Sequence, residues 1–289
     1  MPSKQKTGHN HILDAALYIV ATPIGNLGDM SARGIEVLKA VEVIACEDTR
    51  VSKKLLNHFG IKGTLLSYHE HNAAAMRPKL MDRLLAGESV ALISDAGTPL
   101  ISDPGYKLVS EVQAAGITVI PVPGASAVMA SLMACGLPTD QFAFLGFLPN
   151  QQSHILALLA NWQSVPATLV CFTTPGKVAA HLAAVVEVFG ACDVAIGREL
   201  TKLHEEFIRG NASELLKTLA ERDDLRGEMV MAFRACEVAS TDQLSAQKMD
   251  DLLHDLLTHM PLKAAVDVVV RHTGQPKNQV YQRALELRE

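Results

Sequence analysis

The sequence predicts an α/β protein with two α/β domains followed by a helical segment. Through the first half, short apolar runs rich in β-branched residues alternate with longer amphipathic stretches. That order predicts a parallel sheet with helices on its faces. The alternation restarts around Gly136-Leu-Pro-Thr139, which indicates a second domain, and the strand-like runs stop near residue 240.

The first domain contains five apolar runs that predict strands and four amphipathic stretches that predict the helices between them. The expected strands cover residues 17–22, 41–47, 64–69, 89–94 and 117–122. The expected helices cover residues 31–40, 50–60, 72–87 and 106–116. Gly60, Gly87 and Gly116 stand where glycines commonly end helices.

The second domain is expected to hold a mixed sheet. Strand-like runs occupy residues 142–149, 167–173, 192–200, 205–210 and 227–235. Helical stretches fall near residues 151–162, 176–189 and 213–222. We expect the run EEFIRG (205–210) to pair antiparallel with GEMVMAF (227–233).

The last segment is expected to form three helices, over residues 246–260, 262–274 and 277–289. Two helices joined by a short turn with Gly274 and Pro276, the second ending in basic residues, resemble a helix-turn-helix. A helical cap or dimer arm fits the same pattern. The expected divisions are thus a disordered tail at 1–16, α/β domains at 17–136 and 137–240, and a helical domain at 245–289.

Composition narrows the class of protein. The formal net charge of −5 excludes nucleic-acid binding by bulk positive charge, so any RNA contact requires a local patch. Five scattered cysteines without close pairs fit reduced thiols in the cytosol. The N-terminus lacks the apolar run of a signal peptide, and no run approaches membrane-spanning length. We therefore expect a cytoplasmic protein with no membrane partner.

Unusual loops follow all five strands of the first domain. Ligands of parallel sheets bind beyond the carboxyl ends of the strands, so these loops indicate a site. The loops are TPIGNLGD (22–29), EDTR (47–50), HEHN (69–72), SDAGTPLISDPG (94–105) and PGAS (123–126). By itself TPIGNLGD fits a tight turn, and it is neither GxGxxG nor a Walker loop.

The loop SDAGTPLISDPG has the composition of a rigid binding loop. Asp95 can accept hydrogen bonds from a ribose diol or an amine, while Gly97 and Gly105 allow backbone conformations that other residues avoid. Prolines stiffen the loop, so little order is lost on binding. An acidic loop without lysine suits a neutral or cationic small molecule and not a triphosphate. The loop PGAS is expected to form a second wall of the same pocket, with Ser126 near a helix N-terminus.

The loop EDTR supplies acid–base candidates. Glu47 and Asp48 can orient or deprotonate a hydroxyl group, although Asp48 can equally cap the helix that follows. Arg50 has no evident structural role, and with Lys53 and Lys54 it forms the strongest basic patch of the first domain.

The loop HEHN is expected to place His69 and His71 on one face of a strand end. No third ligand is identifiable, so we expect no metal site and favour substrate contact or capping, with Asn72 as N-cap of the next helix. In the second domain, Arg198 and Glu199 end a strand and can form a surface ion pair. The glycine before Glu228 permits the close approach of a flat ring.

Taken in order, these motifs resemble the ribosomal RNA small subunit methyltransferase I family of the tetrapyrrole methylase superfamily. The motifs are TPIGNLGD, EDTR, HEHN, SDAGTPLISDPG, PGAS, GLPTDQFAFLGFLP, RELTK and GEMV, and the tail LKAAVDVVVRHTGQPKNQVYQRALEL is similar as well. The resemblance implies a two-domain tetrapyrrole methylase fold with S-adenosyl-L-methionine (SAM) in the cleft, and a homodimer. It implies methylation of a cytidine ribose 2′-hydroxyl in the decoding region of 16S ribosomal RNA, with the small ribosomal subunit as partner.

The resemblance also implies which residues line the cofactor site. These are Pro23, Gly25, Asp95, Gly97, Thr98, Asp103, Gly105, Ser126, Ala127, Leu200 and Met229. The catalytic candidates are Glu47, Asp48 and His69 as bases, with Arg50 and Arg198 to steer phosphates. The RNA-contact candidates are Lys53, Lys54, Lys263, Lys277 and Arg283.

The sequence departs from the family pattern in two places. NQQSHILALL and FTTPGKV replace stretches that usually carry basic residues, and only Lys177 remains. Two alternatives therefore stay open: a SAM-dependent methyltransferase acting on a tetrapyrrole or other small acceptor, and a non-catalytic RNA-binding ribosome assembly factor. The helical tail and the EDTR patch argue against the first, and the intact acidic loops argue against the second.

Overall fold

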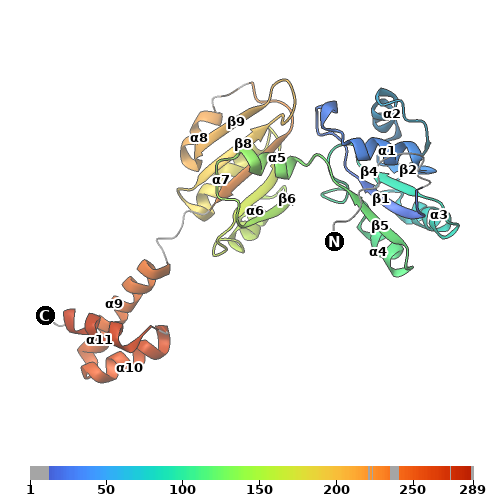
Figure 1. The fold of residues 1–289 in the computed structure, drawn as a ribbon. Coiled ribbons are helices and arrows are strands. Elements are labelled where there is room, and N and C mark those ends of the chain that lie inside the picture. The colour runs from blue at the N-terminus through green and yellow to red at the C-terminus, as the bar shows by residue number, and fades with distance from the viewer. Residues whose placement is uncertain (1–12, 221, 223, 235–240, 274, 288–289) are drawn as a thin grey trace, which may run out of the picture. The chain divides into compact units, whose positions relative to one another are not determined.

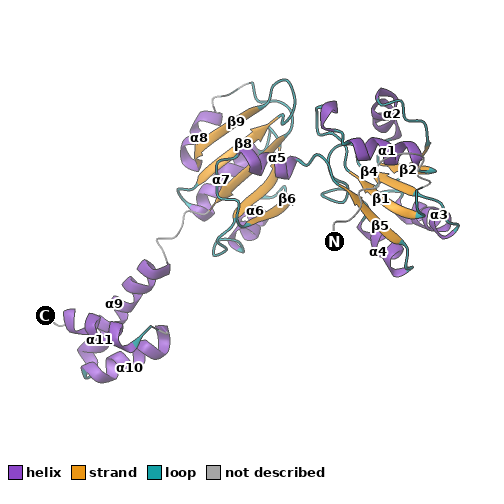
Figure 2. Cartoon of the chain, viewed as in Figure 1, coloured by secondary structure: helices purple, strands orange, loops and turns teal. Residues whose placement is uncertain are grey.

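The structure, a computed structural model, describes residues 13–220, 222, 224–234, 241–273 and 275–287. Within them the chain divides after Arg234 into two compact units. The first unit contains two five-stranded sheets, and the second is helical (Figures 1 and 2). The tail expected at residues 1–16 lies mostly outside the described residues, and the first strand begins at Ala16.

The first sheet is parallel throughout and has the strand order β3-β2-β4-β1-β5. Its strands are β1 (Ala16–Val20), β2 (Val43–Cys46), β3 (Thr64–Ser67), β4 (Val90–Ile93) and β5 (Thr118–Val122). The helices are α1 (Ala32–Ala40), α2 (Thr49–His58), α3 (Ala73–Leu85) and α4 (Tyr106–Ala114), with a 3-10 turn η1 at Leu27–Asp29.

Alternation along β1 shows how the sequence builds two cores around this sheet. Tyr18 and Val20 pack with α1 and α2, whereas Leu17 and Ile19 pack on the opposite face with α3 and α4. Successive side chains of a strand point to opposite faces, so a run that is apolar at every position fits a sheet covered on both sides. The carboxyl ends of all five strands, and hence the five loops, meet at one edge.

Three expected helix ends are confirmed. Gly60, Gly87 and Gly116 follow α2, α3 and α4 with φ of 62°, 89° and 73°. Only glycine adopts this left-handed conformation without strain, so each helix ends where a side chain would resist the turn.

The second sheet is mixed, as expected, with the order β6-β7-β10-β8-β9. Its elements are β6 (Phe142–Phe147), α6 (Gln152–Ala160), β7 (Thr168–Thr173), α7 (Val178–Phe189), β8 (Asp193–Arg198), β9 (Glu206–Asn211), α8 (Ala212–Ala220) and β10 (Met229–Arg234). The strands β6 and β7 are parallel, and the pairs β7–β10, β10–β8 and β8–β9 are antiparallel.

The expected pairing of EEFIRG with GEMVMAF is wrong. Strand β10 inserts between β7 and β8, and β9 pairs only with β8 at the edge of the sheet. The burial pattern explains the order: β10 is buried at every position from Met229 to Phe233, whereas β9 is only partly buried. A strand covered by neighbours on both sides belongs in the middle of a sheet.

Helix α5 (Ala127–Ala134) follows the first sheet in the chain but packs on the second. Its residues Val128 and Leu132 join Val230 and Ala232 of β10 in one core, and α5 contacts β10 directly (Figure 1). The opposite face of the second sheet is covered by α6, α7 and α8. The expected boundary near residue 136 therefore falls after α5, although α5, from Ala127 onward, already packs on the second sheet.

The second unit confirms three helices, α9 (Thr241–His259), α10 (Leu262–Thr273) and α11 (Lys277–Glu286). Leu253, Val266, Val269, Val280 and Ala284 form its core. A small core of this kind holds the helices in a defined arrangement. Among the described residues, no helix is both long and apolar enough to cross a membrane.

Candidate functional site

A pocket of about 420 Å³ lies where the strand-end loops of the first sheet meet the second sheet. From the first sheet it is lined by the loops after β1, β2, β4 and β5 and by the start of α5. From the second sheet it is lined by the ends of β6 and β7, by residues around Gly197 and Leu200, and by the start of β10. Pockets of this size hold small molecules and cofactors.

The structure places most of the expected cofactor residues in this pocket. Those that line it are Asp95, Gly97, Thr98, Asp103, Ser126, Ala127, Leu200 and Met229, and Glu47 lines it as well. Pro23, Gly25 and Gly105 are not among the lining residues. Their neighbour Ile24 lines the pocket instead, so the TPIGNLGD loop contributes an apolar contact.

The loop from Ser94 to Gly105 is held by hydrogen bonds to the loops that follow β1 and β5. Thr22 N donates to Gly97 O at 2.9 Å, Gly97 N donates to Thr22 O at 3.0 Å, and Thr98 Oγ1 donates to Ala125 O at 3.1 Å. Leu100 and Ser102 adopt left-handed φ of 74° and 65°, which is rare for residues with side chains. Strained backbone of this kind clusters at ligand sites, where the surrounding structure holds it in place.

Gly105 supports the loop from below. It has φ of 142°, and a Cβ there would lie 2.9 Å from Leu92 Cδ2. Glycine lets α4 begin directly against the end of β4, which fixes the position of Asp103 two residues earlier.

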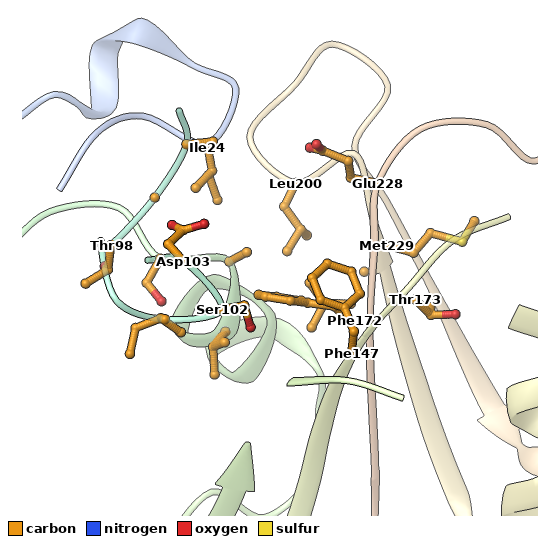
Figure 3. A pocket seen from close by; sticks show the side chains of 18 of the residues that line it. Ile24, Thr98, Ser102, Asp103, Phe147, Phe172, Thr173, Leu200, Glu228 and Met229 are labelled. Atoms are coloured by element: carbon orange, nitrogen blue, oxygen red, sulfur yellow. The ribbon is translucent and has the colours of Figure 1, made fainter. Parts of the chain in front are cut away.

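Asp103 is the most perturbed acid of the pocket. Burial, reinforced by the neighbouring Glu47 and Asp95, raises its pKa to about 6, while a hydrogen bond from Ser94 opposes the rise. Figure 3 shows its carboxylate on the loop side of the cavity, opposite Leu200 and the rings of Phe147 and Phe172. A carboxylate that is costly to ionise because it is buried among other acids is suited to a cationic ligand.

Glu47 follows β2 and lines both this pocket and an adjoining open depression. Burial raises the pKa of Glu47, the Asp95 charge raises it further, and His69 acts in the opposite direction. Asp95 Oδ1 accepts a hydrogen bond from Asp48 N at 3.1 Å, which ties the loops after β2 and β4 together. A carboxylate with a raised pKa at the mouth of a pocket is a candidate general base.

The depression is lined by polar residues from the loops after β2, β3 and β4. They are Glu47, Asp48, Thr49, Arg50, Ser67, His69, His71 and Asp95. Four of the five expected catalytic residues are therefore brought together. His69 lines the depression, and its Nδ1 atom is buried without a hydrogen-bond partner in the described structure.

Asp48 and Arg50 have structural roles. Asp48 is the N-cap of α2 and accepts a hydrogen bond from Arg50 N at 2.8 Å. Its carboxylate also pairs with the Arg50 guanidinium at 2.6 Å, and these hydrogen bonds lower the pKa of Asp48 to about 2. The expectation that Arg50 lacks a structural role is wrong, and the low pKa makes Asp48 a poor base.

The placement expected for the HEHN histidines is also wrong. Strand β3 ends at Ser67, so His69 and His71 lie beyond it in the turn before α3, with their ring centroids 6.0 Å apart. Asn72 occupies the N-cap position, but its side chain does not cap the helix. It accepts from His69 N at 2.9 Å and donates to Ser67 O at 3.0 Å, which shapes the turn. Within the described residues, no group of three or more potential ligands surrounds a metal position.

Arg198 lies at the end of β8 but is not among the residues that line either cavity. Its guanidinium pairs with Glu206 at 3.0 Å and donates to the carbonyl oxygens of Arg226 and Asp224. An ion pair was the alternative role that the sequence offered for Arg198, but its partner is Glu206 and its side chain is only 13% exposed. Arg198 does not line the pocket.

Two of the pocket residues contribute main chain. The side chain of Met229 packs in the core that α6 and α7 form on one face of the second sheet. The side chain of Thr173 points toward the same face, where its Oγ1 lies 2.8 Å from His181 Nδ1 on α7. In Figure 3 both side chains are turned away from the rings of Phe147 and Phe172. The carboxyl end of β7 and the start of β10 thus present backbone groups to the pocket.

Sequence reasoning missed the aromatic wall of the pocket. Phe147 and Phe172 are register partners on β6 and β7, with ring centroids 5.1 Å apart. Phe147 lies three residues before NQQSHILALL, and Phe172 is the first residue of FTTPGKV, the two segments that depart from the family pattern. The available signal was an aromatic residue at the carboxyl end of each of two neighbouring parallel strands. Ile101 and Glu228 were missed as well.

The expected RNA contacts divide into exposed and paired residues. Lys53, Lys54 and Lys263 are exposed on α2 and α10. Lys277 pairs with Asp267 at 2.6 Å, and Arg283 pairs with Asp250 and Glu286, both at 2.7 Å. These pairs hold α9, α10 and α11 together, so Lys277 and Arg283 have a structural use within the helical unit.

Comparisons with known proteins agree with this architecture. The family description "Tetrapyrrole (Corrin/Porphyrin) Methylases" matches residues 16–216, and "RsmI C-terminal HTH domain" matches residues 242–288. The solved structure of uroporphyrin-III C-methyltransferase from Thermus thermophilus, complexed with S-adenosyl homocysteine, has a TM-score of 0.53 at 17% identity. It covers 75% of this chain and 96% of its own, and at that identity it shows the shared fold.

Curated relatives of much higher identity carry one name, ribosomal RNA small subunit methyltransferase I. The protein of Mesorhizobium japonicum is 46% identical over 278 residues, which cover 96% of this chain and 94% of the relative. The protein of Pseudomonas aeruginosa is 42% identical and covers 93% of this chain and 96% of the relative. The fold is that of the tetrapyrrole methylases, and the chain belongs to the ribosomal RNA small subunit methyltransferase I family.

Proposed function

We propose that the protein is a SAM-dependent methyltransferase that methylates the ribose 2′-hydroxyl of a cytidine in the decoding region of 16S ribosomal RNA. One observation carries the proposal: a small-molecule pocket and an open polar depression share Glu47 and Asp95 as a common wall. A cofactor in the first and a ribose in the second would meet at these carboxylates.

The pocket fits SAM in its chemistry. Glu47, Asp95, Asp103 and Glu228 are acidic, and none of the described residues that line it is Lys, Arg or His. That charge suits a sulfonium cofactor and disfavours a nucleotide triphosphate. Phe147 and Phe172 offer aromatic surface for a base, and the end of β7 and the start of β10 offer backbone groups.

The chain's own residues supply positioning and proton transfer. SAM supplies an activated methyl group, and the electron pair of the broken carbon–sulfur bond stays with sulfur. Glu47 accepts the proton of the ribose hydroxyl as the new oxygen–carbon bond forms. His69 lines the depression beside Glu47, and its half-buried ring is placed to contact the ribose or the adjacent phosphate. Holding the reactants in line contributes much of the rate.

The wider proposal includes the partner and the assembly. The exposed Lys53 and Lys54 of α2 follow directly on the depression and are placed to meet RNA phosphates. Met129 and Met133 are 45% and 84% exposed and lie four residues apart on α5, which offers an apolar surface to a second copy of the chain. The proposed site of action is the cytoplasm, on the small ribosomal subunit.

Substitution of Glu47 by Gln tests the catalytic assignment. We expect turnover to fall by about a hundredfold or more, because general-base catalysis commonly contributes that much. The dissociation constant for SAM should change far less, since Gln keeps the shape of the side chain. Glu36→Gln, an exposed change on α1, is the matched control. Unchanged turnover in Glu47→Gln would remove Glu47 as the base.

A further inference from the structure

Among the described residues, three of the four carboxylates that line the pocket form no ion pair with a cationic side chain. Glu228 is the exception, because it pairs with Lys202 at 2.9 Å. Asp95 accepts a hydrogen bond from the backbone N of Asp48, and a hydrogen bond from Ser94 opposes the rise in the pKa of Asp103. Arg50, which pairs with Asp48, and His69, which lowers the pKa of Glu47, line the adjoining depression and not the pocket. The pocket therefore carries more negative charge than its own residues compensate.

SAM and the product that it leaves after methyl transfer differ by one methyl group on sulfur and by the positive charge of the sulfonium. SAM carries a sulfonium, whereas S-adenosylhomocysteine (SAH) carries a neutral thioether, and the rest of the two molecules is identical. An interaction that depends on this charge distinguishes them, and one with the adenosine or the amino-acid end does not. Resting on the proposed function, we infer that Asp103 makes the pocket selective for the sulfonium over the thioether, and so favours release of the product.

Geometry singles out Asp103 among the acids. It lies two residues before Gly105, whose close contact with Leu92 fixes the end of the loop, and the left-handed Ser102 precedes it. Its carboxylate faces the apolar side of the cavity formed by Leu200, Phe147 and Phe172 (Figure 3). A charge opposite apolar walls is poorly screened, so it attracts a cation more strongly than an exposed acid does.

Because Asp103 titrates, the selectivity for the sulfonium should depend on pH. Its pKa of about 6 means that part of the Asp103 population is protonated just below neutral pH, and the protonated form does not attract a sulfonium. By linkage, a bound sulfonium favours the ionised form, so SAM binding near pH 6 should release protons. Glu47, Asp95 and Ser94 are the groups that face Asp103, and none of them supplies a positive charge.

The test is calorimetric titration of the full-length protein with three probes. SAM and sinefungin, in which an ammonium-bearing carbon replaces the methylsulfonium, are both cationic at this position, and SAH is neutral. At pH 7.5 we expect SAM and sinefungin to bind about tenfold more tightly than SAH. Lowering the pH to 5.5 should weaken the two cations several-fold and leave SAH nearly unchanged. Proton release should accompany binding of the cations only.

Asp103→Asn and the exposed control Asp82→Asn on α3 complete the design. Asp103→Asn should reduce the preference for SAM over SAH at least fivefold, and Asp82→Asn should leave it unchanged. Equal affinity of the wild type for SAM and SAH, or an equal loss of both in Asp103→Asn, would overturn the inference and leave the proposed methyl transfer standing. Absence of any SAM binding would overturn both. The pH series on the wild type decides the question even if the variant does not fold.

Discussion

At the scale of single residues, the site depends on carboxylates whose surroundings differ sharply. Asp48 is hydrogen-bonded to Arg50, which lowers its pKa to about 2. Asp103 is desolvated, which raises its pKa to about 6, and burial raises the pKa of Glu47 in the same direction. Asp48 caps α2, and we propose base chemistry for Glu47 and cation binding for Asp103, although the sequence presents three similar acids.

The raised pKa of Asp103 predicts a cost in folding stability. The folded-state pKa lies above the ordinary value of 3.8, so the folded protein holds this proton more tightly than the unfolded chain. The cost is absent below about pH 4, grows as pH rises, and is complete above about pH 6.

Asp103→Asn should therefore raise the free energy of unfolding at pH 7.5, by on the order of 1 kcal/mol. The gain should shrink as pH falls from 6 toward 4. Thermal unfolding of the ligand-free protein across this range measures the effect. A variant that is less stable than the wild type at pH 7.5 would show that the carboxylate is stabilised in the fold.

At the scale of elements, two loops from different sheets interlock beside the pocket. Asn26 N donates to Thr201 Oγ1 at 3.1 Å, and a Cβ on Gly25 would lie 2.4 Å from Lys202 Cγ. Lys202 is itself held by Glu199 and Glu228, both at 2.9 Å. Gly25 is therefore required for close contact between the loops, and these loops set the positions of Ile24 and Leu200 in the pocket.

Gly25→Ala should weaken SAM binding about tenfold, because the added methyl group displaces the Lys202 side chain and the loop that carries Leu200. The control is Gly60→Ala. Its added Cβ would have no heavy atom within 4 Å, so the φ of 62° is the one source of strain in this variant. The control should cost about 1 kcal/mol of stability with no change in SAM affinity. Calorimetry and thermal unfolding of both variants separate the effects. Equal SAM affinity in the two variants would contradict the assignment.

The strands and helices also show which parts of the fold the sequence could predict. The five strands of the first sheet and the four helices between them were predictable, because the strands are short apolar runs and α2, α3 and α4 each end at a glycine. The position of β10 was not, because strand order depends on contacts between distant segments. The aromatic wall was missed for the same reason: Phe147 and Phe172 become neighbours only when β6 and β7 pair.

At the scale of the whole molecule, the chain combines a pocket-bearing unit with a separate helical unit. The pocket is built entirely from residues of the first unit, 24 to 230. The second unit has its own core and its own ion pairs, and Lys263 is exposed on it. Cofactor binding and RNA engagement are therefore separable in principle.

Truncation after Arg234 should leave SAM affinity within about twofold of the full chain and should reduce methylation of small ribosomal subunits by at least tenfold. The reason is that RNA affinity depends on distributed phosphate contacts, which the truncation removes. Calorimetry with SAM measures the first effect, and initial rates of methyl incorporation measure the second. Full methylation by the truncated chain would show that the helical unit is dispensable for substrate binding.

The most direct test of the proposed function is to locate the transferred methyl group. The protein would be incubated with methyl-labelled SAM and small ribosomal subunits that lack the modification, and RNA fragments would be analysed by mass spectrometry. The account predicts label on the 2′-oxygen of one cytidine ribose in the decoding region, and its loss with Glu47→Gln. Absence of label while calorimetry shows bound SAM would contradict the RNA acceptor and would point to a different substrate for the depression beside Glu47.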